Sequence, residues 1–209
     1  MTTVEAETEP LREDSNRPGA LAPMLLVLDL DETLIHAREQ PLAHAADFEV
    51  MGYHVYARPH LERFIVECAA RFRLAVWSAG TDDYVRAIVG RIFPPAHRPE
   101  LVWGRSRCTW AVDRARVREE GFLDPAIHCG YVKKLGKLKR RGFRLERVLI
   151  VDDTPAKCVH NYGNAIYVRP FEGALDDEVL PVLSRYLDTF TDVPDVRRLE
   201  KRGWWRAGA

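Results

Sequence analysis

The sequence places two aspartates where carboxylates are costly to hold. In "LLVLDLDETLIH", residues 25 to 36, an apolar run leads directly into Asp29 and Asp31, and Thr33 follows them. Two carboxylates in a half-buried place repel each other unless a cation or a proton lies nearby. At this spacing one carboxylate could attack an electrophile while its neighbour transfers protons. The groups that the fold brings beside them decide which reaction this is.

Short aliphatic runs predict the strands that position these aspartates. They are residues 24–29, 72–78, 147–153 and, shorter than the rest, 165–168. None of the first three alternates apolar with polar residues, which is typical of strands covered on both faces. Helical patterns lie between them, in residues 59–72 and 82–93. Because strands alternate with helices, we expect an α/β fold, a Rossmann-like parallel sheet with helices on both faces.

Two segments interrupt this alternation. Residues 38–58 predict a small β-hairpin inserted after the first strand, turning at Met51 and Gly52. Residues 94–130 are rich in Pro, Arg and Trp with weak periodicity, and they predict an irregular insertion before the third motif. Insertions of this kind commonly shape a substrate site.

The C-terminal part of the chain predicts one more helix and a tail. Apolar residues recur at helical spacing over 175–190, and Pro181 predicts that this helix bends or restarts there. Residues 192–209 predict a short basic helix and a tail. The expected regions are a disordered leader over 1–22, a catalytic domain over 23–190 and a C-terminal helix and tail over 191–209.

Polar residues that follow parallel strands meet at one edge of the sheet, where ligands bind. The candidates brought together in this way are Asp29, Asp31, Thr33, Ser78, Ala79, Asp152, Asp153 and, from a segment before the third strand, Lys133. Four carboxylates in one crevice need a cation, and hard oxygen ligands in small number suit Mg²⁺.

The remaining groups of this set suit phosphate. Ser78 precedes a helix whose free N–H groups would point at a phosphate oxygen, and the lysine adds a fixed positive charge. A metal, a phosphate pocket and a spare carboxylate together predict phosphoryl transfer. Asp29 would attack phosphorus, and Asp31 would protonate the leaving oxygen and then activate water.

Four motifs in this order also carry a family resemblance. They are "DLDETLIH", "VWSAGTDDY", "GYVKKLGKL" and "VLIVDDTP", and the resemblance spans residues 24 to 190. The chain resembles the haloacid dehalogenase superfamily, and within it the branch of the RNA polymerase II carboxy-terminal-domain phosphatases and their small, NLI-interacting-factor-like relatives. A single aspartate motif is not specific for this superfamily, but four motifs in this order and at this spacing are.

The resemblance implies a catalytic and a metal-binding set. Asp29 matches the nucleophile and a Mg²⁺ ligand, and Asp31 matches the general acid/base that binds the metal through its backbone carbonyl. Asp153 matches the remaining metal ligand, and Asp152 would support the metal site from behind. Lys133 matches the lysine that balances charge on the nucleophile and the phosphate, and its choice over the neighbouring lysines rests on the family register.

The resemblance also implies a phosphate-binding set of Thr33, Ser78, Ala79 and Arg105. Ser78 matches the phosphate-binding hydroxyl, Thr33 supports the loop and orients the acid, and Arg105 matches an arginine near the phosphate. The family pattern has no large cap domain, and an open site of this kind suits phosphoprotein substrates. The segment between Arg105 and Lys133 is longer than the family pattern, which leaves the role of this insertion open.

The expected function is therefore a Mg²⁺-dependent phosphomonoester hydrolase acting through an aspartyl-phosphate, and specifically a phosphoserine/phosphothreonine protein phosphatase. The alternatives are a phosphatase for a small metabolite or a nucleic-acid 3′ end, and a non-catalytic phosphopeptide-binding module. The presence of both Asp29 and Asp31 disfavours the binding module. Lys+Arg and Asp+Glu each total 31, so bulk charge gives no support to a nucleic-acid partner.

Composition excludes several other classes. No apolar run approaches the roughly 20 residues that span a bilayer, so no membrane partner is expected. The four cysteines lie far apart and form no CxxC pair, which disfavours structural zinc and favours reduced thiols in a cytoplasmic protein. The physiological substrate, the pathway and the oligomeric state are not determined by these patterns.

Overall fold

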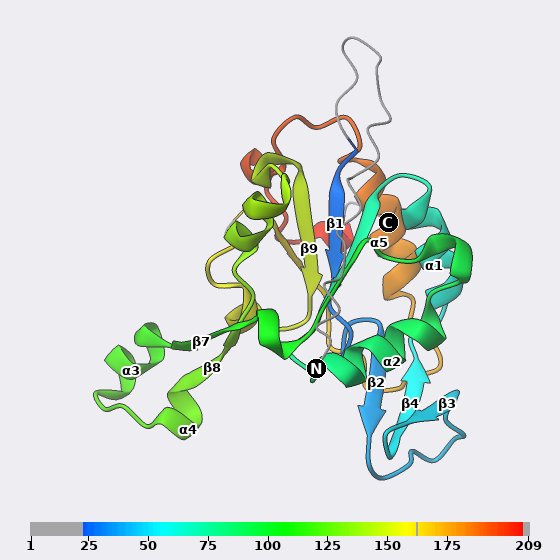
Figure 1. The fold of residues 1–209 in the computed structure, drawn as a ribbon, viewed down its shortest axis with the longest axis horizontal. Helices are drawn as coiled ribbons and strands as arrows, with labels where there is room; N and C mark the ends of the chain where they lie inside the picture. The colour runs from blue at the N-terminus through cyan, green and yellow to red at the C-terminus, as the bar shows by residue number, and fades with distance from the viewer. Residues whose placement is uncertain (1–22, 162, 207–209) are drawn as a thin grey trace, which may run out of the picture.

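The core of the molecule is a five-stranded parallel sheet (Figure 1). The structure is a computed structural model that describes residues 23–161 and 163–206, so the predicted leader over 1–22 lies outside the described residues. The strands of the five-stranded sheet, in spatial order, are β10 (Ala165–Tyr167), β9 (Val148–Asp152), β1 (Leu25–Leu28), β5 (Arg73–Trp77) and β6 (Leu101–Trp103). The predicted Rossmann-like α/β fold is confirmed.

The register of the central strands determines where the polar residues lie. Leu28 of β1 pairs with Val76 of β5 on one side and Val151 of β9 on the other. The three strands therefore end side by side, and the residues that follow them meet at one edge. β1 lies at the centre, with later strands added on both sides of it, so this edge is also the topological switch point of the sheet.

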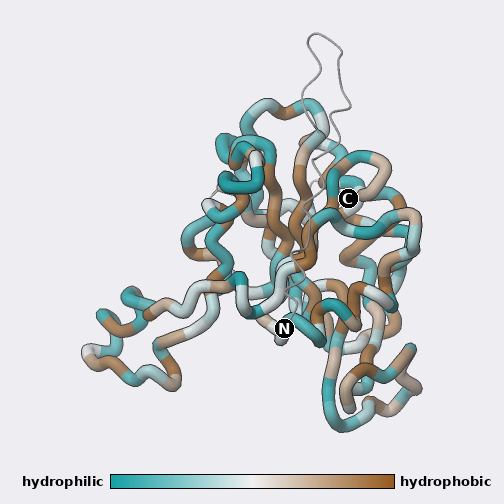
Figure 2. The backbone as a smooth tube through the Cα atoms, viewed as in Figure 1, coloured by the Kyte–Doolittle hydropathy of each residue, from teal (hydrophilic) through white to brown (hydrophobic). Residues whose placement is uncertain are grey.

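Two hydrophobic layers cover the sheet. Leu26 and Leu28 pack in the layer formed with α1 (Leu61–Ala69), α2 (Asp82–Ile92) and α5 (Val179–Asp188). The opposite face, including Val27, is covered by residues of two 3-10 helices, η3 and η5, instead of long α-helices. The 3-10 helices are η1 (Pro95–His97), η2 (Arg105–Arg107), η3 (Leu135–Arg141), η4 (Leu145–Arg147), η5 (Pro155–Cys158), η6 (Val196–Arg198) and η7 (Trp204–Arg206). Figure 2 shows the hydrophobic residues concentrated along the central strands.

The predicted hairpin after the first strand is confirmed and belongs to a three-stranded sheet. Its strands are β2 (Ile35–Arg38), β4 (Tyr53–Ala57) and β3 (Phe48–Val50), in that spatial order. Met51 and Gly52 form the two-residue turn with φ angles of 52° and 85°. Both are left-handed, as a type I′ hairpin turn requires, and glycine tolerates this conformation best.

The expectation of an irregular segment over 94–130 was wrong. It contains β6, which forms an edge of the main sheet, and an extended arm of β7 (Thr109–Val112), α3 (Arg114–Glu120), α4 (Pro125–His128) and β8 (Cys129–Val132). The arm, residues 109–132, projects from the body of the molecule (Figure 1). β6 has only three residues, which is too short for a periodicity signal.

The expected bend or restart of the C-terminal helix at Pro181 was wrong, since α5 is one continuous helix from Val179 to Asp188. The helix begins at Val179, so Pro181 lies in the first turn, where no intrahelical N–H bond is lost. Leu175, expected on the apolar stripe, is 76% exposed and lies before the helix. The Asp177 carboxylate accepts a hydrogen bond from Val179 N at 2.9 Å and fixes the start of the helix.

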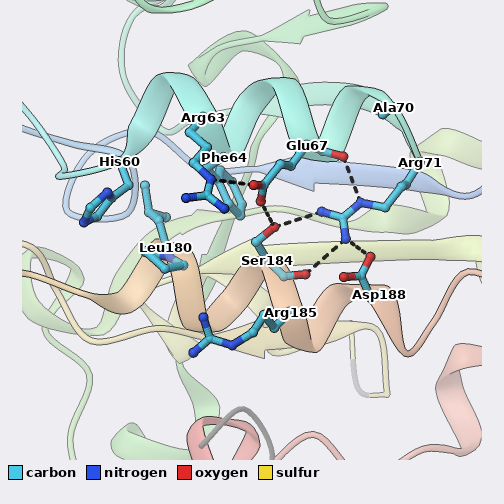
Figure 3. Close-up of a pocket in the computed structure, with 11 residues that line it drawn as sticks. His60, Arg63, Phe64, Glu67, Ala70, Arg71, Leu180, Ser184, Arg185 and Asp188 are labelled. Atoms are coloured by element: carbon cyan, nitrogen blue, oxygen red, sulfur yellow. Dashed lines mark hydrogen bonds and ion pairs between the residues drawn. The ribbon is translucent and has the colours of Figure 1, made fainter.

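A polar network joins α5 to α1 (Figure 3). Arg71 donates from Nη2 to Ser184 Oγ at 2.9 Å and forms an ion pair with Asp188. Ser184 in turn donates to Glu67 Oε2 at 2.5 Å. These residues line a hollow of about 510 Å³ between the two helices. Because the residues that line the hollow bind one another, their contacts hold the two helices together.

The C-terminal segment packs against the sheet. The expected short basic helix over 192–209 is represented by the one-turn helices η6 and η7. Trp204 is buried, and its Nε1 donates to the Tyr167 carbonyl of β10 at 2.7 Å. Among residues 23–161 and 163–206, no helix has the length and apolar character needed to cross a membrane.

Candidate active site

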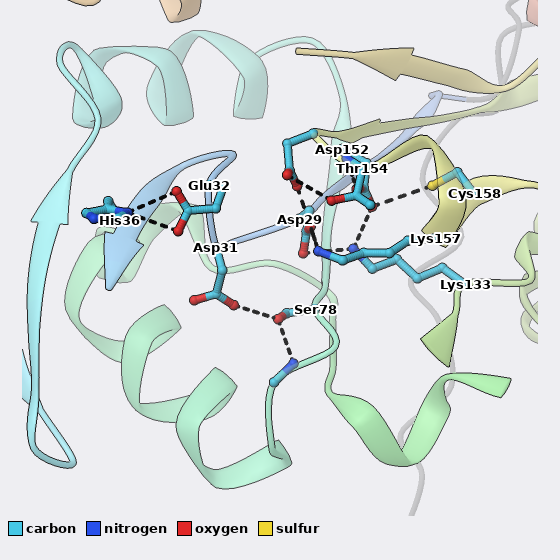
Figure 4. Close-up of polar contacts among 12 residues, drawn as sticks. Asp29, Asp31, Glu32, His36, Ser78, Lys133, Asp152, Thr154, Lys157 and Cys158 are labelled. Atoms are coloured by element: carbon cyan, nitrogen blue, oxygen red, sulfur yellow. Dashed lines mark hydrogen bonds and ion pairs between the residues drawn. The ribbon is translucent and has the colours of Figure 1, made fainter. Parts of the chain in front are cut away.

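The loop after β1 turns sharply and fixes Asp29 at the edge of the sheet. Asp29 N donates to the Val151 carbonyl of β9 at 3.0 Å, so the aspartate still belongs to the sheet. The Leu30 carbonyl then accepts hydrogen bonds from Thr33, Leu34 and Ile35, which closes a tight turn. The Asp29 side chain is buried and points at the groups that follow β9 (Figure 4).

Lys133 forms the tightest contact with this carboxylate. Its Nζ lies 2.7 Å from Asp29 Oδ1 and 2.7 Å from Asp152 Oδ2, and its side chain is fully buried. Burial alone would lower the pKa of Lys133, but the two carboxylates outweigh it and raise that pKa. The ammonium group therefore stays charged. Lys137, a sequence alternative, instead donates to the Arg107 carbonyl at 2.6 Å.

Asn161 holds the lysine in place. Its Nδ2 donates to the Lys133 carbonyl at 2.6 Å, and its Oδ1 accepts from Leu135 N at 3.0 Å. Asn161 is buried, so it fixes the backbone on both sides of Lys134 as the chain leaves the arm. The sequence offered no signal for this role, because an asparagine after a short turn is typical of a surface loop.

The end of β9 supplies two more carboxylates. Burial and the negative charge of Asp29 raise the pKa of Asp152 to about 6, although Lys133 acts in the opposite sense. Asp152 Oδ1 accepts a hydrogen bond from Thr154 N at 2.9 Å. Asp153 Oδ2 accepts from Thr154 Oγ1 at 2.8 Å. Thr154 therefore orients both carboxylates towards Asp29.

The three carboxylates fit a metal ion. Asp29, Asp152 and Asp153 each offer an oxygen, and these oxygens lie within 4.8 Å of one another. Asp153 Oδ1 is buried and accepts no hydrogen bond from the described part of the chain. Asp29 Oδ1 likewise accepts none there, and its contact with Lys133 is an ion pair without hydrogen-bond geometry. An all-oxygen set with free lone pairs suits a hard divalent cation.

Asp31 points to a different set of partners. Its Oδ2 accepts a hydrogen bond from Ser78 Oγ at 3.0 Å, and its Oδ1 accepts one from Tyr84 Oη at 2.6 Å. Burial raises the pKa of Asp31, the Tyr84 hydrogen bond counteracts it, and the charge of Asp29 raises it further. The two aspartates of the opening motif thus have separate environments, as separate chemical roles require.

The loop after β5 lies against Asp31. Ser78 Oγ also accepts a hydrogen bond from Gly80 N at 3.0 Å, which closes the turn before α2. A Cβ at Gly80 would lie 2.8 Å from a ring carbon of Tyr84, so this close approach requires glycine. Arg105 donates from Nε to the Ala79 carbonyl at 2.8 Å and stacks on Tyr131, 5.3 Å from the ring centroid. Arg105 therefore contacts both this loop and Tyr131, which follows it in the chain.

Comparisons with known proteins identify the family of this chain. A family model of NLI interacting factor-like phosphatases matches residues 24–197. The chain belongs to this phosphatase family. The match confirms the predicted resemblance to the NLI-interacting-factor-like phosphatases.

Individual members of the family show how far the likeness extends. The human CTD small phosphatase-like protein is 28% identical over 167 residues, which cover 76% of this chain and 53% of the relative. The human carboxy-terminal domain RNA polymerase II polypeptide A small phosphatase 1 is 28% identical over 179 residues, covering 82% and 60%. Nuclear envelope morphology protein 1 of Schizosaccharomyces pombe is 29% identical over 187 residues, covering 83% and 34%.

The matched region is only part of these relatives, since the chain spans about half the length of the first two. Among solved structures, fission yeast RNA polymerase II CTD phosphatase Fcp1 bound to beryllium fluoride has a TM-score of 0.46 at 16% identity. That match covers 84% of this chain and 53% of the other.

Most of the predicted site residues of this family member come together. Asp29, Asp152, Asp153 and Lys133 form one contact network, and Asp31 with Ser78 forms a second beside it. Thr33 takes a different position from the others of the predicted phosphate-binding set. The Thr33 side chain is fully buried, and within the described residues its Oγ1 neither donates nor accepts a hydrogen bond. Thr33 therefore lies beneath the surface of the loop.

Sequence reasoning missed two side chains beside Asp29 and Asp31. Tyr84 occupies a buried position on α2, where an aromatic residue is typical of core packing. Lys157 has its Nζ 3.5 Å from Asp29 Oδ2, and it comes from η5 (Figure 4). Its position four residues after Asp153 could have marked it, since a helical turn brings residues at that spacing together.

Proposed function

We propose that this chain is a Mg²⁺-dependent phosphomonoesterase that acts through an aspartyl-phosphate on phosphoserine or phosphothreonine in proteins. The observation that supports it best is the pair of separate environments. The Asp29 carboxylate faces Lys133 and the carboxylate cluster, while Asp31 is held by two hydroxyl donors. One carboxylate is thereby suited to attack phosphorus and the other to exchange protons.

The proposed first step forms a bond between an Asp29 oxygen and phosphorus and breaks the phosphorus–oxygen bond to the substrate. The leaving alkoxide takes a proton from Asp31. Lys133 remains charged beside Asp29 and offsets the negative charge gathering there. Ser78 Oγ and Tyr84 Oη hold the Asp31 carboxyl in place as it gives up the proton.

In the second step Asp31 takes a proton from a water molecule, whose oxygen attacks the phosphorus of the acyl phosphate. The bond between phosphorus and Asp29 breaks, which releases inorganic phosphate and restores both carboxyl groups. Mg²⁺ would be held by Asp29, Asp153 and the Asp31 backbone carbonyl, and it would neutralise phosphoryl oxygens during both steps.

The names of two relatives support the proposed substrate class. Two of the relatives described above are named as small phosphatases of the polymerase carboxy-terminal domain or proteins like them. A phosphorylated residue in a protein chain is the substrate that we propose here. We also propose a cytoplasmic location, because all four cysteines are free thiols, as a reducing compartment maintains them.

The test is hydrolysis of an aryl phosphate with Mg²⁺ and with chelator, wild type beside Asp29→Asn. We expect metal-dependent turnover that falls at least about a thousandfold in Asp29→Asn, because an amide cannot form the acyl phosphate. Asp176→Asn, at an exposed position, is the matched control and should retain wild-type turnover. Equal turnover in wild type and Asp29→Asn would contradict the proposed nucleophile.

A substrate panel then separates the remaining alternatives. Phosphoserine and phosphothreonine peptides should be hydrolysed with a higher kcat/KM than sugar phosphates or 3′-phosphorylated oligonucleotides. Faster turnover of either of the latter would move the assignment to a metabolite or nucleic-acid phosphatase. Tight binding of phosphopeptides without turnover of any of them would identify a binding module.

A further inference from the structure

Lys157 is a second lysine at the carboxylate cluster, and its contacts are unlike those of Lys133. Its Nζ lies 3.5 Å from Asp29 Oδ2 and 3.8 Å from Asp153 Oδ1, against 2.7 Å for both ion pairs of Lys133. The Lys157 side chain is 26% exposed, whereas that of Lys133 is fully buried. Figure 4 shows the two lysines reaching Asp29 from neighbouring segments.

The difference determines which lysine can move. Lys133 is enclosed between two carboxylates, and Asn161 fixes its backbone. Lys157 instead has a long flexible stem with access to solvent, and neither of its contacts is short. An ammonium group in that situation can leave the carboxylates at low cost, because water solvates it as soon as it moves.

The charge balance of the carboxylate cluster indicates when the Lys157 ammonium group would leave. The cluster of Asp29, Asp152 and Asp153 carries three negative charges, and the two lysines offset two of them. A divalent cation added beside both lysines would leave an excess of positive charge in a buried place, which is costly. If Lys157 moved away as the cation entered, the charges of the cluster would cancel.

Lys157 also faces the oxygens that a cation needs. Asp153 Oδ1 is buried and has no hydrogen-bond donor within residues 23–161 and 163–206, so Lys157 supplies its neutralising charge from a distance. The same oxygen is a free ligand for a metal. The lysine and the cation therefore compete for the same two carboxylates, Asp29 and Asp153.

We propose that Lys157 is a displaceable counterion of the metal site, which neutralises Asp29 and Asp153 until a divalent cation replaces it. This inference rests on the proposed function, because it takes the metal site from there. The lysine lowers the affinity for Mg²⁺ and stabilises the protein when no metal is bound. Lys157 thus weakens metal binding but strengthens the metal-free fold. A residue that only packs, or only binds substrate, would not produce both effects.

The experiment measures binding of Mg²⁺ and of Mn²⁺ by calorimetry, with no substrate present, for wild type, Lys157→Met and Lys157→Arg. In Lys157→Met we expect the Kd for Mg²⁺ to fall by about tenfold or more, since a unit charge about 4 Å from the ligands opposes the cation. Lys157→Arg keeps the charge, so its Kd should stay closer to that of wild type. Lys139→Met removes an exposed lysine and controls for the general loss of one charge.

The second measurement is the melting temperature in chelator and in excess Mg²⁺. Lys157→Met should melt below wild type in chelator and gain more than wild type from Mg²⁺. Equal Kd values for wild type and a folded Lys157→Met would overturn this inference while leaving the proposed phosphatase intact. Absence of Mg²⁺ and Mn²⁺ binding to wild type would instead overturn both, and the two failures are thus distinguishable.

Discussion

At the scale of single residues, the site separates two aspartates that are two positions apart in the sequence. Asp29 points into the buried cluster of charges, whereas Asp31 points at the hydroxyl groups of Ser78 and Tyr84. The turn closed on the Leu30 carbonyl produces this divergence. Each carboxylate therefore has its own partners, and substitutions at the two positions should have different kinetic signatures.

Asp31→Asn tests the role of the second aspartate. The amide cannot donate a proton to the leaving oxygen, so we expect the loss in turnover to be at least about tenfold greater for a phosphoserine peptide than for nitrophenyl phosphate. The nitrophenolate ion leaves without a proton, but serine alkoxide does not. Steady-state kcat/KM for the two substrates checks this, and equal losses would argue against proton transfer by Asp31.

At the scale of elements, the loop that carries the aspartates is tied to the rest of the fold by Arg58. This buried arginine, directly after β4, donates from Nη1 to the Thr33 carbonyl at 2.9 Å. It also donates from Nε and Nη2 to both oxygens of Asp177, at 2.8 and 2.9 Å, just before α5. One side chain thus joins the loop that carries Asp29 and Asp31, the hairpin sheet and α5.

Asp177→Asn should destabilise the protein because it leaves the buried Arg58 without its counterion. We expect the free energy of unfolding at pH 7 to fall by about 3 kcal/mol. Arg169→Ala is the matched control: this exposed arginine lies 4.0 Å from Asp177 and should contribute less than about 0.5 kcal/mol. Urea unfolding of the three proteins measures both differences, and equal effects of the two substitutions would contradict the assignment.

The same ion pair predicts a pH dependence. Burial tends to raise the pKa of Asp177, but the hydrogen bonds from Arg58 and from Val179 N outweigh it and lower that pKa below 3.8. A carboxyl group whose pKa is lower in the folded than in the unfolded protein stabilises the fold at pH values above its unfolded-state pKa. That stabilisation is lost as the pH falls through the folded-state pKa. The difference in unfolding free energy between wild type and Asp177→Asn should thus persist at pH 5 and shrink below about pH 4.

Much of this arrangement follows from the sequence, and the exceptions have physical causes. The long aliphatic strands and their terminal aspartates were predictable, because a buried strand and the polar residues after it leave a local pattern. The strand β6 and residues such as Asn161, Arg58 and Tyr84 leave no such pattern. Their roles depend on partners more than 25 residues away in the chain, as the separations for Asn161–Lys133 (28), Arg58–Asp177 (119) and Tyr84–Asp31 (53) illustrate.

At the scale of the whole molecule, most of the arm lies apart from the core that carries the site, and its base contacts that core through Tyr131 and Val132. Its two strands begin and end beside each other, with Thr109 paired to Val132 and Ala111 paired to Gly130. Its buried histidine, His128, binds Glu120 of the same arm at 2.8 Å. The apolar side chains Trp110 and Phe122 are 58% and 54% exposed, so the arm contributes little to the common core.

Replacement of residues 112–129 by an Asn-Gly turn should therefore leave the core intact. The new turn joins Ala111 to Gly130 in the type I′ geometry that suits a two-residue hairpin. We expect the unfolding free energy to change by no more than about 1 kcal/mol, with aryl phosphate turnover retained because Asn161 still holds Lys133. Turnover lost in a variant with a wild-type melting temperature would show that the arm takes part in the chemistry.

The order of the strands has a consequence for how the site forms during folding. β1 lies in the middle of the sheet, and some of its neighbours come much later in the chain. Asp29 contacts Lys157, which lies 128 positions further along the sequence. Contacts this distant close slowly, because the chain entropy of a long loop opposes them. During synthesis, the N-terminal half of the chain carries Asp29, the proposed nucleophile, for seconds before Lys133 and Lys157 are made. Catalytic competence therefore arises only when the second half of the sheet has docked, and activity reports the completion of folding.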